Sequence, residues 1–292
     1  MTAVSGPDLV IAACRAGVIG AFPTHNAPSC EALDEWLSRI EGELTPACAP
    51  VAANLVVHRS NRRLAEDLEC VQRHGVELVI TSVGSPEPVV GALHDAGAQV
   101  YADVASLVHA RRALDAGVDG LVLLTAGAGG QTGWANPFAF VRAVREHYAG
   151  PLVLAGGITD GRSILAAEVL GVDLVYLGTR FIATRESLAD SAYRDALVAA
   201  SMDDVKLSTR VGGIPASLLA SWLSRAEQSG PHGQSSTAGF DQDRLLTNSA
   251  AWSAGHSVSG VSAVTSVPDL VATLTAQYAQ ARAESERKVT DE

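Results

Sequence analysis

A short unit that recurs through the first 180 residues constrains the fold of this chain more than any other feature. Each copy holds a glycine, a small apolar residue and a polar or acidic residue, and an apolar run follows. The copies HGVE, AGAQ, AGVD and LGVD precede the runs LVIT, VYAD, GLVLLT and LVYLG. A glycine that ends a helix and leads into a short apolar strand is typical of alternating β/α units. Such units build a parallel sheet that is covered by helices.

Seven apolar runs predict the strands of a TIM, or (β/α)8, type of barrel. They lie at residues 18–21, 51–56, 78–80, 100–102, 121–124, 152–155 and 174–177. A complete barrel needs an eighth strand, but the opening MTAVSGPDLVIAACRAG predicts a loop and then a helix. We therefore expect an α/β barrel whose first strand is missing or truncated at the N-terminus. Either a longer reading frame or another segment would fill the gap.

The β/α rhythm divides the chain into three parts. Residues 1–200 are expected to form the barrel, and residues 201–250, where the rhythm is lost, a lid-like insertion. The insertion contains SRAEQSGPHGQSSTAGFDQD, whose serine, glycine and glutamine content predicts a mobile loop. Residues 251–292 are expected to form a turn segment and a helix that packs back on the barrel.

The overall composition excludes several classes of function. The formal net charge of −11 and the lack of a basic run argue against nucleic acid and anionic membrane surfaces as partners. No signal peptide and no 18-residue apolar span is evident. The four cysteines show neither a CxxC pair nor a histidine spacing typical of zinc, so we expect no metal and free thiols in a cytoplasmic protein.

Two glycine turns follow the last two predicted strands. Gly156 and Gly157 follow the strand at 152–155, and Gly178 and Thr179 follow the strand at 174–177. Glycine exposes its backbone N–H without a Cβ, and the first turn leads to a helix that Asp160 can cap. The loops after the last two strands of a barrel form its usual phosphate site. These turns therefore predict a bound phosphate, although either turn alone is equally well explained as a tight turn.

The most glycine-rich segment, AGAGGQTGW at residues 126–134, follows the predicted strand at 121–124. Its position is at the catalytic end of a barrel, where glycines let the backbone lie close to a flat ligand. The segment does not match the GxGxxG pattern of a dinucleotide-binding fold. A flexible loop without a ligand is the simpler alternative.

A few polar residues interrupt or end the predicted strands. Asn54 lies inside a buried strand and needs hydrogen-bond partners, although the sequence alone favours a satisfied core amide over a ligand contact. His25 and His58 follow two early strands and either could serve as a general base, although a lone loop histidine is more often exposed. Asp103 and Thr125 end two further strands and could contact a ligand.

Taken together, these segments resemble the nitronate monooxygenase, or 2-nitropropane dioxygenase-like, family of FMN-dependent barrel enzymes. The similarity extends over nearly the whole chain and depends on the order of the motifs SGPDLVIAACRAGVIGAF, AANLVV, AGAGGQTGW, LAGGI, LGTRF and WSAGHSVSG. The resemblance implies FMN as the cofactor, and the residues that it implies as contacts are Asn54, Gly129, Gly130, Gly156, Gly157, Gly178 and Thr179.

One residue departs from the family pattern in a way that bears on catalysis. The family loop carries a histidine after its glycine pair, whereas this chain has Gln131. An amide cannot take up a proton at neutral pH. Gln131 would then orient the substrate, and His25 or His58 could replace the missing base.

The resemblance implies an oxidoreductase of the nitronate monooxygenase type, which oxidises a nitronate or a related small substrate with O2. The alternatives are an FMN-dependent enoyl-type reductase that uses NAD(P)H and a catalytically degenerate barrel that binds phosphate or flavin. A sugar-phosphate enzyme is less favoured, because no lysine or carboxylate pair ends a strand. A homodimer is compatible with the sequence.

Overall fold

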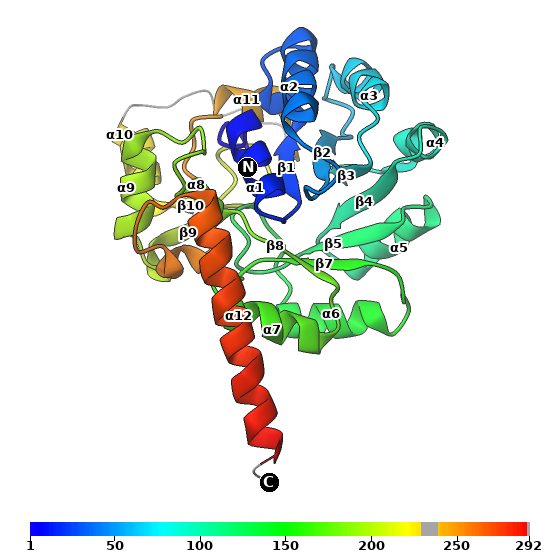
Figure 1. Cartoon of the computed structure of the whole chain (residues 1–292). Coiled ribbons are helices and arrows are strands. Elements are labelled where there is room, and N and C mark those ends of the chain that lie inside the picture. The colour runs from blue at the N-terminus through cyan, green and yellow to red at the C-terminus, as the bar shows by residue number, and fades with distance from the viewer. Residues whose placement is uncertain (229–238, 291–292) are drawn as a thin grey trace.

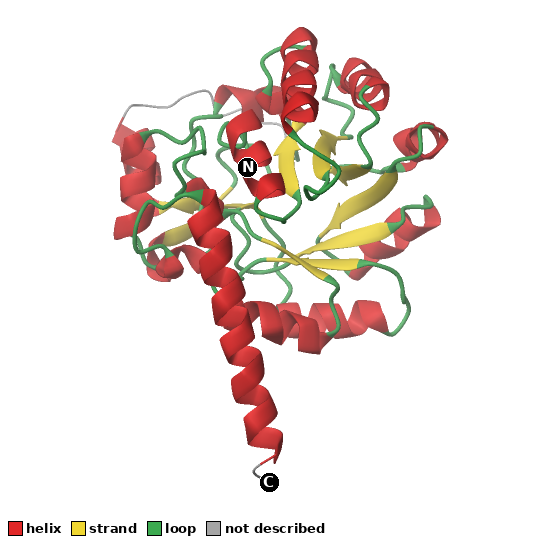
Figure 2. Ribbon diagram, viewed as in Figure 1, coloured by secondary structure: helices red, strands yellow, loops and turns green. Residues whose placement is uncertain are grey.

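The main body of the protein is one curled, parallel sheet surrounded by helices. The computed structural model describes residues 1–228 and 239–290. Seven strands pair in the order β1-β2-β3-β4-β5-β7-β8, and Figures 1 and 2 show them curling around a common centre. Their bounds are β1 (Gly20–Pro23), β2 (Val51–Val56), β3 (Leu78–Ser82), β4 (Gln99–Val104), β5 (Gly120–Leu124), β7 (Leu152–Ala155) and β8 (Leu174–Tyr176). All seven strands predicted from the sequence are confirmed.

The strands are apolar on both faces because each face packs against a different part of the core. Side chains that point into the curl, such as Ile80, Tyr101 and Val122, form one cluster. Those that point outward, such as Val79 and Leu121, pack against the helices in a larger cluster. This two-sided burial explains why the sequence shows short apolar runs rather than an alternating pattern.

Helices follow the strands in regular alternation and cover the outside of the sheet. They are α1 (Pro7–Arg15), α2 (Cys30–Glu43), α3 (Leu64–Arg73), α4 (Glu87–Asp95), α5 (Leu107–Asp115), α6 (Pro137–Arg145) and α7 (Gly161–Leu170). The predicted boundaries of α7 are confirmed. Asp160 caps the helix by accepting from the Ser163 amide at 2.8 Å, and Gly171 ends it with φ of 103°.

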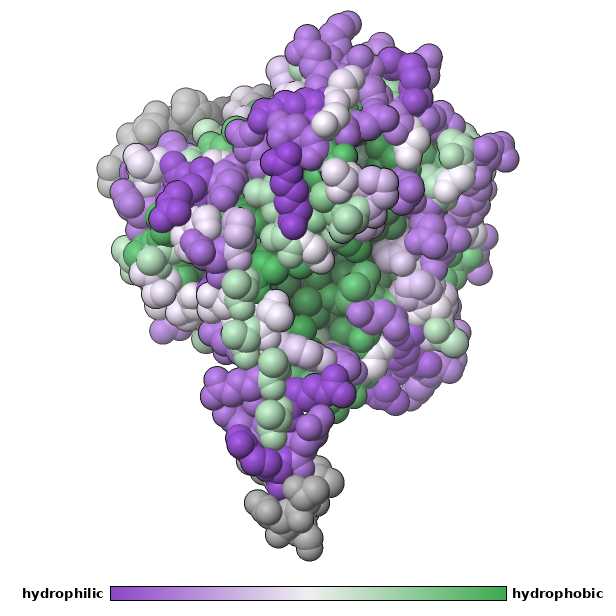
Figure 3. Space-filling model, viewed as in Figure 1, coloured by the Kyte–Doolittle hydropathy of each residue, from purple (hydrophilic) through white to green (hydrophobic). Residues whose placement is uncertain are grey.

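The sheet does not close into a full barrel within the described residues. β1 and β8 form its two edges, and no ladder joins them. We call the opening between these edges the seam. It is a cavity of about 800 Å³, lined by β1, β8, α1 and the last helix and, inside the curl, by side chains such as Ile80, Tyr101 and Val122. In Figure 3 it is the green hollow at the centre of the face shown.

A second, smaller layer lies against the body. A three-stranded antiparallel sheet, in the order β6-β10-β9, joins β6 (Gly130–Gln131), β10 (Ala216–Leu219) and β9 (Val205–Ser208). The helices of this region are α8 (Thr179–Ile182), α9 (Ser191–Ala199), α10 (Ala220–Gln228) and α11 (Gln242–Thr247). The sequence patterns do not predict this sheet. Half of the predicted mobile loop, residues 229–238, lies outside the described residues, and its two ends fall in the helices α10 and α11.

The last helix, α12 (Val267–Thr290), packs against α7 and α1 before it extends away from the body (Figure 1). Its backbone at Gln277 and Tyr278 lies so close to Gly161 that a Cβ on this glycine would collide with it. Within the described part of the chain, no helix has the length and apolar character to cross a membrane.

The Tyr101 ring lies against the backbone of the neighbouring strand inside the curl, which makes one glycine important for stability. Gly120 lies opposite Tyr101 in the β4–β5 ladder, and a Cβ at Gly120 would lie 2.7 Å from the tyrosine ring. We expect Gly120→Ala to lower the free energy of unfolding by about 1–3 kcal/mol. In contrast, Gly42→Ala in α2, where the added Cβ meets nothing within 4 Å, should raise it by about 0.5–1 kcal/mol. Chemical denaturation of both variants checks this, and equal effects would contradict the packing described here.

Candidate cofactor and active site

The candidate site is a cavity at the end of the sheet where the carboxyl ends of the strands lie. We call this end the carboxyl rim. Each of the seven strands contributes inward-pointing side chains to the wall of the cavity near its carboxyl end, and β2 contributes two. These residues are Pro23, Asn54, Val56, Ser82, Asp103, Leu124, Ala155 and Tyr176. The cavity therefore lies at the carboxyl ends of the strands, where barrel enzymes place their catalytic groups.

The two glycine turns lie side by side at this rim. β7 and β8 are paired neighbours, so Gly157 and Gly178 border the same cavity. Gly157 has φ of 74°, and a Cβ on it would meet no atom within 4 Å. Within the described residues, the amides of Gly157 and Gly178 donate to no protein acceptor. Free backbone amides that border a cavity fit an anionic group such as a phosphate.

The helix that follows the first turn contributes less to anion binding than its position in the sequence indicates. The Asp160 carboxylate and the Ser163 hydroxyl form a capping box at the start of α7. The side chain of Asp160 therefore occupies the N-terminus of this helix. An anion in the cavity would depend on the amides of the turns themselves.

The glycine-rich loop is fixed by contact with a segment far away in the sequence. A Cβ on Gly129 would lie 2.7 Å from the Gly255 amide nitrogen, and one on Gly127 would lie 2.9 Å from His256 Nδ1. The His256 amide donates to the Gly127 carbonyl at 2.9 Å, and the Gly255 amide donates to Thr179 Oγ1 at 2.9 Å. The loop, the second turn and the segment at residues 252–260 thus form one continuous backbone wall.

Gln131 lies in β6, and its backbone pairs with Ala216 of β10. It borders the cavity together with Val211, Gly212 and Ile214, which precede β10. The antiparallel ladder holds Gln131 against this region. A short strand of two residues gives too little periodicity to be predicted from sequence.

Three polar side chains from adjacent strands form the floor of the cavity. Asn54 is buried in β2, and its Oδ1 accepts from the Ser82 hydroxyl of β3 at 3.0 Å. Asp103 of β4 lies beside them, and its Oδ1 is inaccessible to solvent and has no hydrogen-bond partner. The predicted need of Asn54 for a partner is thus met by a serine, while a carboxylate oxygen remains unsatisfied.

Burial raises the pKa of the Asp103 carboxyl to about 7, although the positive amino group of Met1 and the Asn54 amide act in the opposite direction. The Met1 amino group, in turn, has its pKa lowered to about 6, first by burial, while Asp103 opposes that change. A carboxyl with a pKa near neutrality inside a cavity is a candidate for proton transfer.

The structure separates the two histidines that the sequence proposes as bases. His25 borders the cavity, and its Nε2 lies 3.3 Å from the Thr2 hydroxyl. Burial, followed by the charges of Met1 and Arg63, lowers its pKa to about 3. His58 is absent from the described residues that line the cavity, and its ring packs edge-on against Phe240 at 5.2 Å.

Of the other residues proposed from the sequence, seven border the cavity and Thr125 does not. All seven proposed cofactor contacts border the cavity: Asn54, Gly129, Gly130, Gly156, Gly157, Gly178 and Thr179. Thr125, by contrast, is fully buried and donates to the Ala155 carbonyl at 2.9 Å, so it ties β5 to β7.

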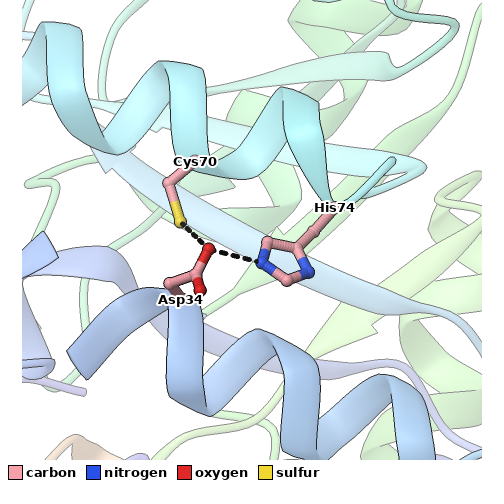
Figure 4. A group of neighbouring side chains, drawn as sticks. All are labelled: Asp34, Cys70 and His74. Carbon is pink, nitrogen blue, oxygen red and sulfur yellow. Dashed lines mark hydrogen bonds and ion pairs between the residues drawn. The ribbon is translucent and has the colours of Figure 1, made fainter. Parts of the chain in front are cut away.

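A group of potential metal ligands lies elsewhere, between α2 and α3 (Figure 4). Asp34 Oδ1 lies 3.0 Å from His74 Nε2 and 4.0 Å from Cys70 Sγ. The same oxygen pairs with the Arg73 guanidinium at 2.6 Å. Because a cation already neutralises this carboxylate, we interpret the group as a link between the two helices.

Size alone does not identify the site. The cavity at the rim is about 210 Å³, which is smaller than the seam cavity of about 800 Å³. The seam cavity, however, is lined mainly by apolar side chains such as Leu9, Val122 and Leu274. The free glycine amides and the unsatisfied carboxylate are at the rim, so we assign the site there.

Comparison with known proteins points to one family. A model of the family described as nitronate monooxygenase matches residues 36–277. A dehydrogenase of Mycobacterium tuberculosis, named for a 5-hydroxy-7a-methyl-1-oxo-octahydro-indene-4-carboxyl-CoA ester, is 29% identical over 231 residues. The match covers 78% of this chain and 63% of the relative, so the chain spans less than two thirds of that protein.

Two solved structures share the fold over nearly their whole length. A nitroalkane oxidase from Streptomyces ansochromogenes has a TM-score of 0.83 at 23% identity, with 97% of this chain and 94% of that chain covered. FabK from Thermotoga maritima has a TM-score of 0.82 at 23% identity, with 99% and 93% covered. These similarities show that the curled seven-stranded sheet has the TIM-barrel architecture.

The buried carboxyl of Asp103 predicts a pH-dependent change in stability. The native state keeps its proton up to about pH 7, whereas an unfolded aspartate ionises near pH 4. The wild type should therefore lose stability relative to Asp103→Asn as the pH rises from about 4 to 7. Above pH 7 the variant should melt higher, by about 2–4 °C for each kcal/mol that is relieved.

Thermal melts of both proteins across this range measure the difference. Asp115→Asn, which changes an exposed aspartate in the helix after β4, serves as the control and should show a pH-independent difference from the wild type. A flat difference for Asp103→Asn as well would show that this carboxyl titrates normally.

Proposed function

The chain belongs to the nitronate monooxygenase family, and from this membership we propose that it is an FMN-dependent oxidoreductase that oxidises a nitronate or a related small substrate with O2. The observation that carries the proposal is the pair of glycine turns at the ends of β7 and β8, whose free amides border one cavity. Backbone amides in this arrangement suit the phosphate of a mononucleotide.

The cavity offers complementary groups for each part of FMN. Gly157, Gly178 and Thr179 would hold the phosphate, with Gly156 packed behind the first turn against Thr125. Asn54, Gly129 and Gly130 would lie along the isoalloxazine ring, because the glycine loop presents backbone without side chains. When bound, the flavin supplies the redox chemistry, and the protein positions the substrate against it.

Gln131 would orient the substrate rather than take its proton. Its amide can donate to a nitro or carbonyl oxygen but is not basic at neutral pH. A nitronate is already deprotonated when it arrives, so it needs no base. His25 and His58 remain candidates for a displaced base, and the position of His25 in the wall of the cavity favours it over His58.

A second candidate is a flavin-dependent reductase or dehydrogenase of the enoyl type that uses NAD(P)H. The relative from Mycobacterium tuberculosis, which is named as a CoA-ester dehydrogenase, supports this class. A degenerate barrel that binds flavin without turnover is a third. We further propose that the protein is cytoplasmic, because all four cysteines are free thiols. A homodimer is compatible with this proposal. Residues 201–250 would form the lid over the site.

The absorbance spectrum of the purified protein, followed by mass spectrometry of the released ligand, tests the proposal. We expect the spectrum and the mass of FMN, and O2 consumption when a nitronate is added. Rapid bleaching by NAD(P)H without air would instead favour the reductase. A colourless protein that gains no flavin on reconstitution would overturn both assignments.

A substitution at Gly157 is the most specific test of the proposed phosphate position. We expect Gly157→Val to lose FMN, because the added side chain would project into the space where the phosphate binds. Gly97→Val is the matched control, since Gly97 also has a positive φ, 83°, and a Cβ added there would meet nothing within 4 Å. Both variants carry a similar backbone strain. Flavin content per protein, measured after gel filtration, should fall at least tenfold only for Gly157→Val, and full retention would show that the phosphate lies elsewhere.

A further inference from the structure

The proposed function leaves one question about the substrate. A nitronate needs no base, whereas a neutral nitroalkane must first lose a proton from the carbon that bears the nitro group. The groups that could accept this proton are few. Gln131 is an amide, and His58 does not line the cavity. His25 has a buried Nδ1 without a partner, but its pKa, lowered to about 3, makes it a weak base.

We propose that Asp103 is the proton acceptor of this site and that the enzyme therefore takes neutral nitroalkanes as well as nitronates. The inference rests on the proposed function, because it assumes oxidation of this substrate class. Among the described residues that line the cavity, Asp103 carries the only carboxylate.

The register of the sheet gives Asp103 its position. Its neighbours Ala102 and Val104 pack outward against the helices. Tyr101, two residues before Asp103 and on the same face of the strand, packs inside the curl. Asp103 is therefore the last residue of β4 that points into the curl, level with Ser82 and next to Asn54 on the cavity floor. Its carboxylate faces the cavity from the rigid sheet rather than from a loop.

One oxygen of the carboxylate is also unsatisfied. Oδ1 is buried and has no hydrogen-bond partner, while the residue as a whole is partly exposed and borders the cavity. A buried polar atom without a partner is costly to maintain, which is typical of groups that are kept for function. The raised pKa of Asp103 matches the requirement that a general base titrate near the operating pH.

The proton transfer is balanced within the site. The C–H bond of the nitroalkane breaks, and its electron pair stays on the substrate as the C=N bond of the nitronate. The proton forms an O–H bond with a carboxylate oxygen of Asp103. The nitronate is then the same species that the proposed oxidation uses, and proton release to solvent restores Asp103.

The neighbouring groups set the charge of this carboxyl. Asn54 on β2 and the Met1 amino group favour its ionised form. Tyr176 on β8 borders the same cavity, and burial and then the Asp103 charge raise the pKa of its phenol. His25 also borders the cavity with its pKa lowered, so it is neutral where Asp103 titrates.

Turnover of a matched pair, nitroethane and its nitronate, tests the proposal. Each protein is assayed with FMN bound and with rates normalised to flavin content. We expect Asp103→Asn to reduce kcat/KM for nitroethane by about 10²–10⁴-fold, the usual cost of losing a general base. The nitronate value should fall by less than about tenfold, because the nitronate needs no proton acceptor. Asp103→Glu should retain more nitroethane turnover than Asp103→Asn, and Asp115→Asn should match the wild type.

The outcomes separate this proposal from the proposed function. A wild type that oxidises neither compound would overturn the proposed function. A wild type that oxidises only the nitronate, or an Asp103→Asn variant that loses both equally, would overturn the role of Asp103.

Infrared spectroscopy of the flavin-free protein gives an independent readout. The carbonyl band of a buried, protonated carboxyl should be present at pH 6, disappear at pH 8 and be absent from Asp103→Asn. A spectrum without this band would show that Asp103 is an ordinary, ionised aspartate. The measurement does not depend on turnover, so it also applies to a variant that binds flavin poorly.

Discussion

The pair of backbone turns that end β7 and β8 is the constraint on which the rest of the site depends. Parallel pairing of these strands places Gly157 and Gly178 at the same edge, with their amides free of protein acceptors among the described residues. Backbone donors must supply the contact there, because Asp160 occupies the start of the following helix. In the proposed site, an anion would be held by backbone groups whose positions the sheet sets, and its position would orient the rest of a bound ligand.

The opposite wall depends on close contact between two glycine-containing backbones. Gly129 and Gly255 lie so near each other that neither position has room for a Cβ, and Gly255 also donates to Thr179 beside the second turn. A segment near the C-terminus therefore connects the glycine loop to the second glycine turn. Trp252, at the start of this segment, stacks on the ring of Tyr193, with ring centroids 5.3 Å apart. The C-terminal quarter of the chain is in this way part of the site and not an appendage to it.

Local patterns in the sequence are sufficient to predict the barrel strands and the caps of α7, because buried parallel strands and glycine-ended helices leave signals over a few residues. The same patterns place Gly157 and Gly178 at one edge of the sheet. The three-stranded sheet that holds Gln131 is not predicted, since β6 has two residues and Gln131 pairs with Ala216, far along the chain. The state of Asp103 is not predictable either, because it depends on burial by side chains from several strands. The two histidines look alike in sequence, and only the packed structure separates His25 from His58.

The affinity of the flavin-free protein for FMN compared with riboflavin tests the central claim most directly. The two ligands share the ring system and differ in the phosphate, so their ratio isolates the contribution of the turns at β7 and β8. Charge-assisted hydrogen bonds contribute about 1.5–3 kcal/mol each, and two of them correspond to a preference for FMN of at least about hundredfold. Titration by flavin fluorescence should show this preference. Equal affinities for FMN and riboflavin would mean that the turns do not bind a phosphate, and the account of the site would be wrong.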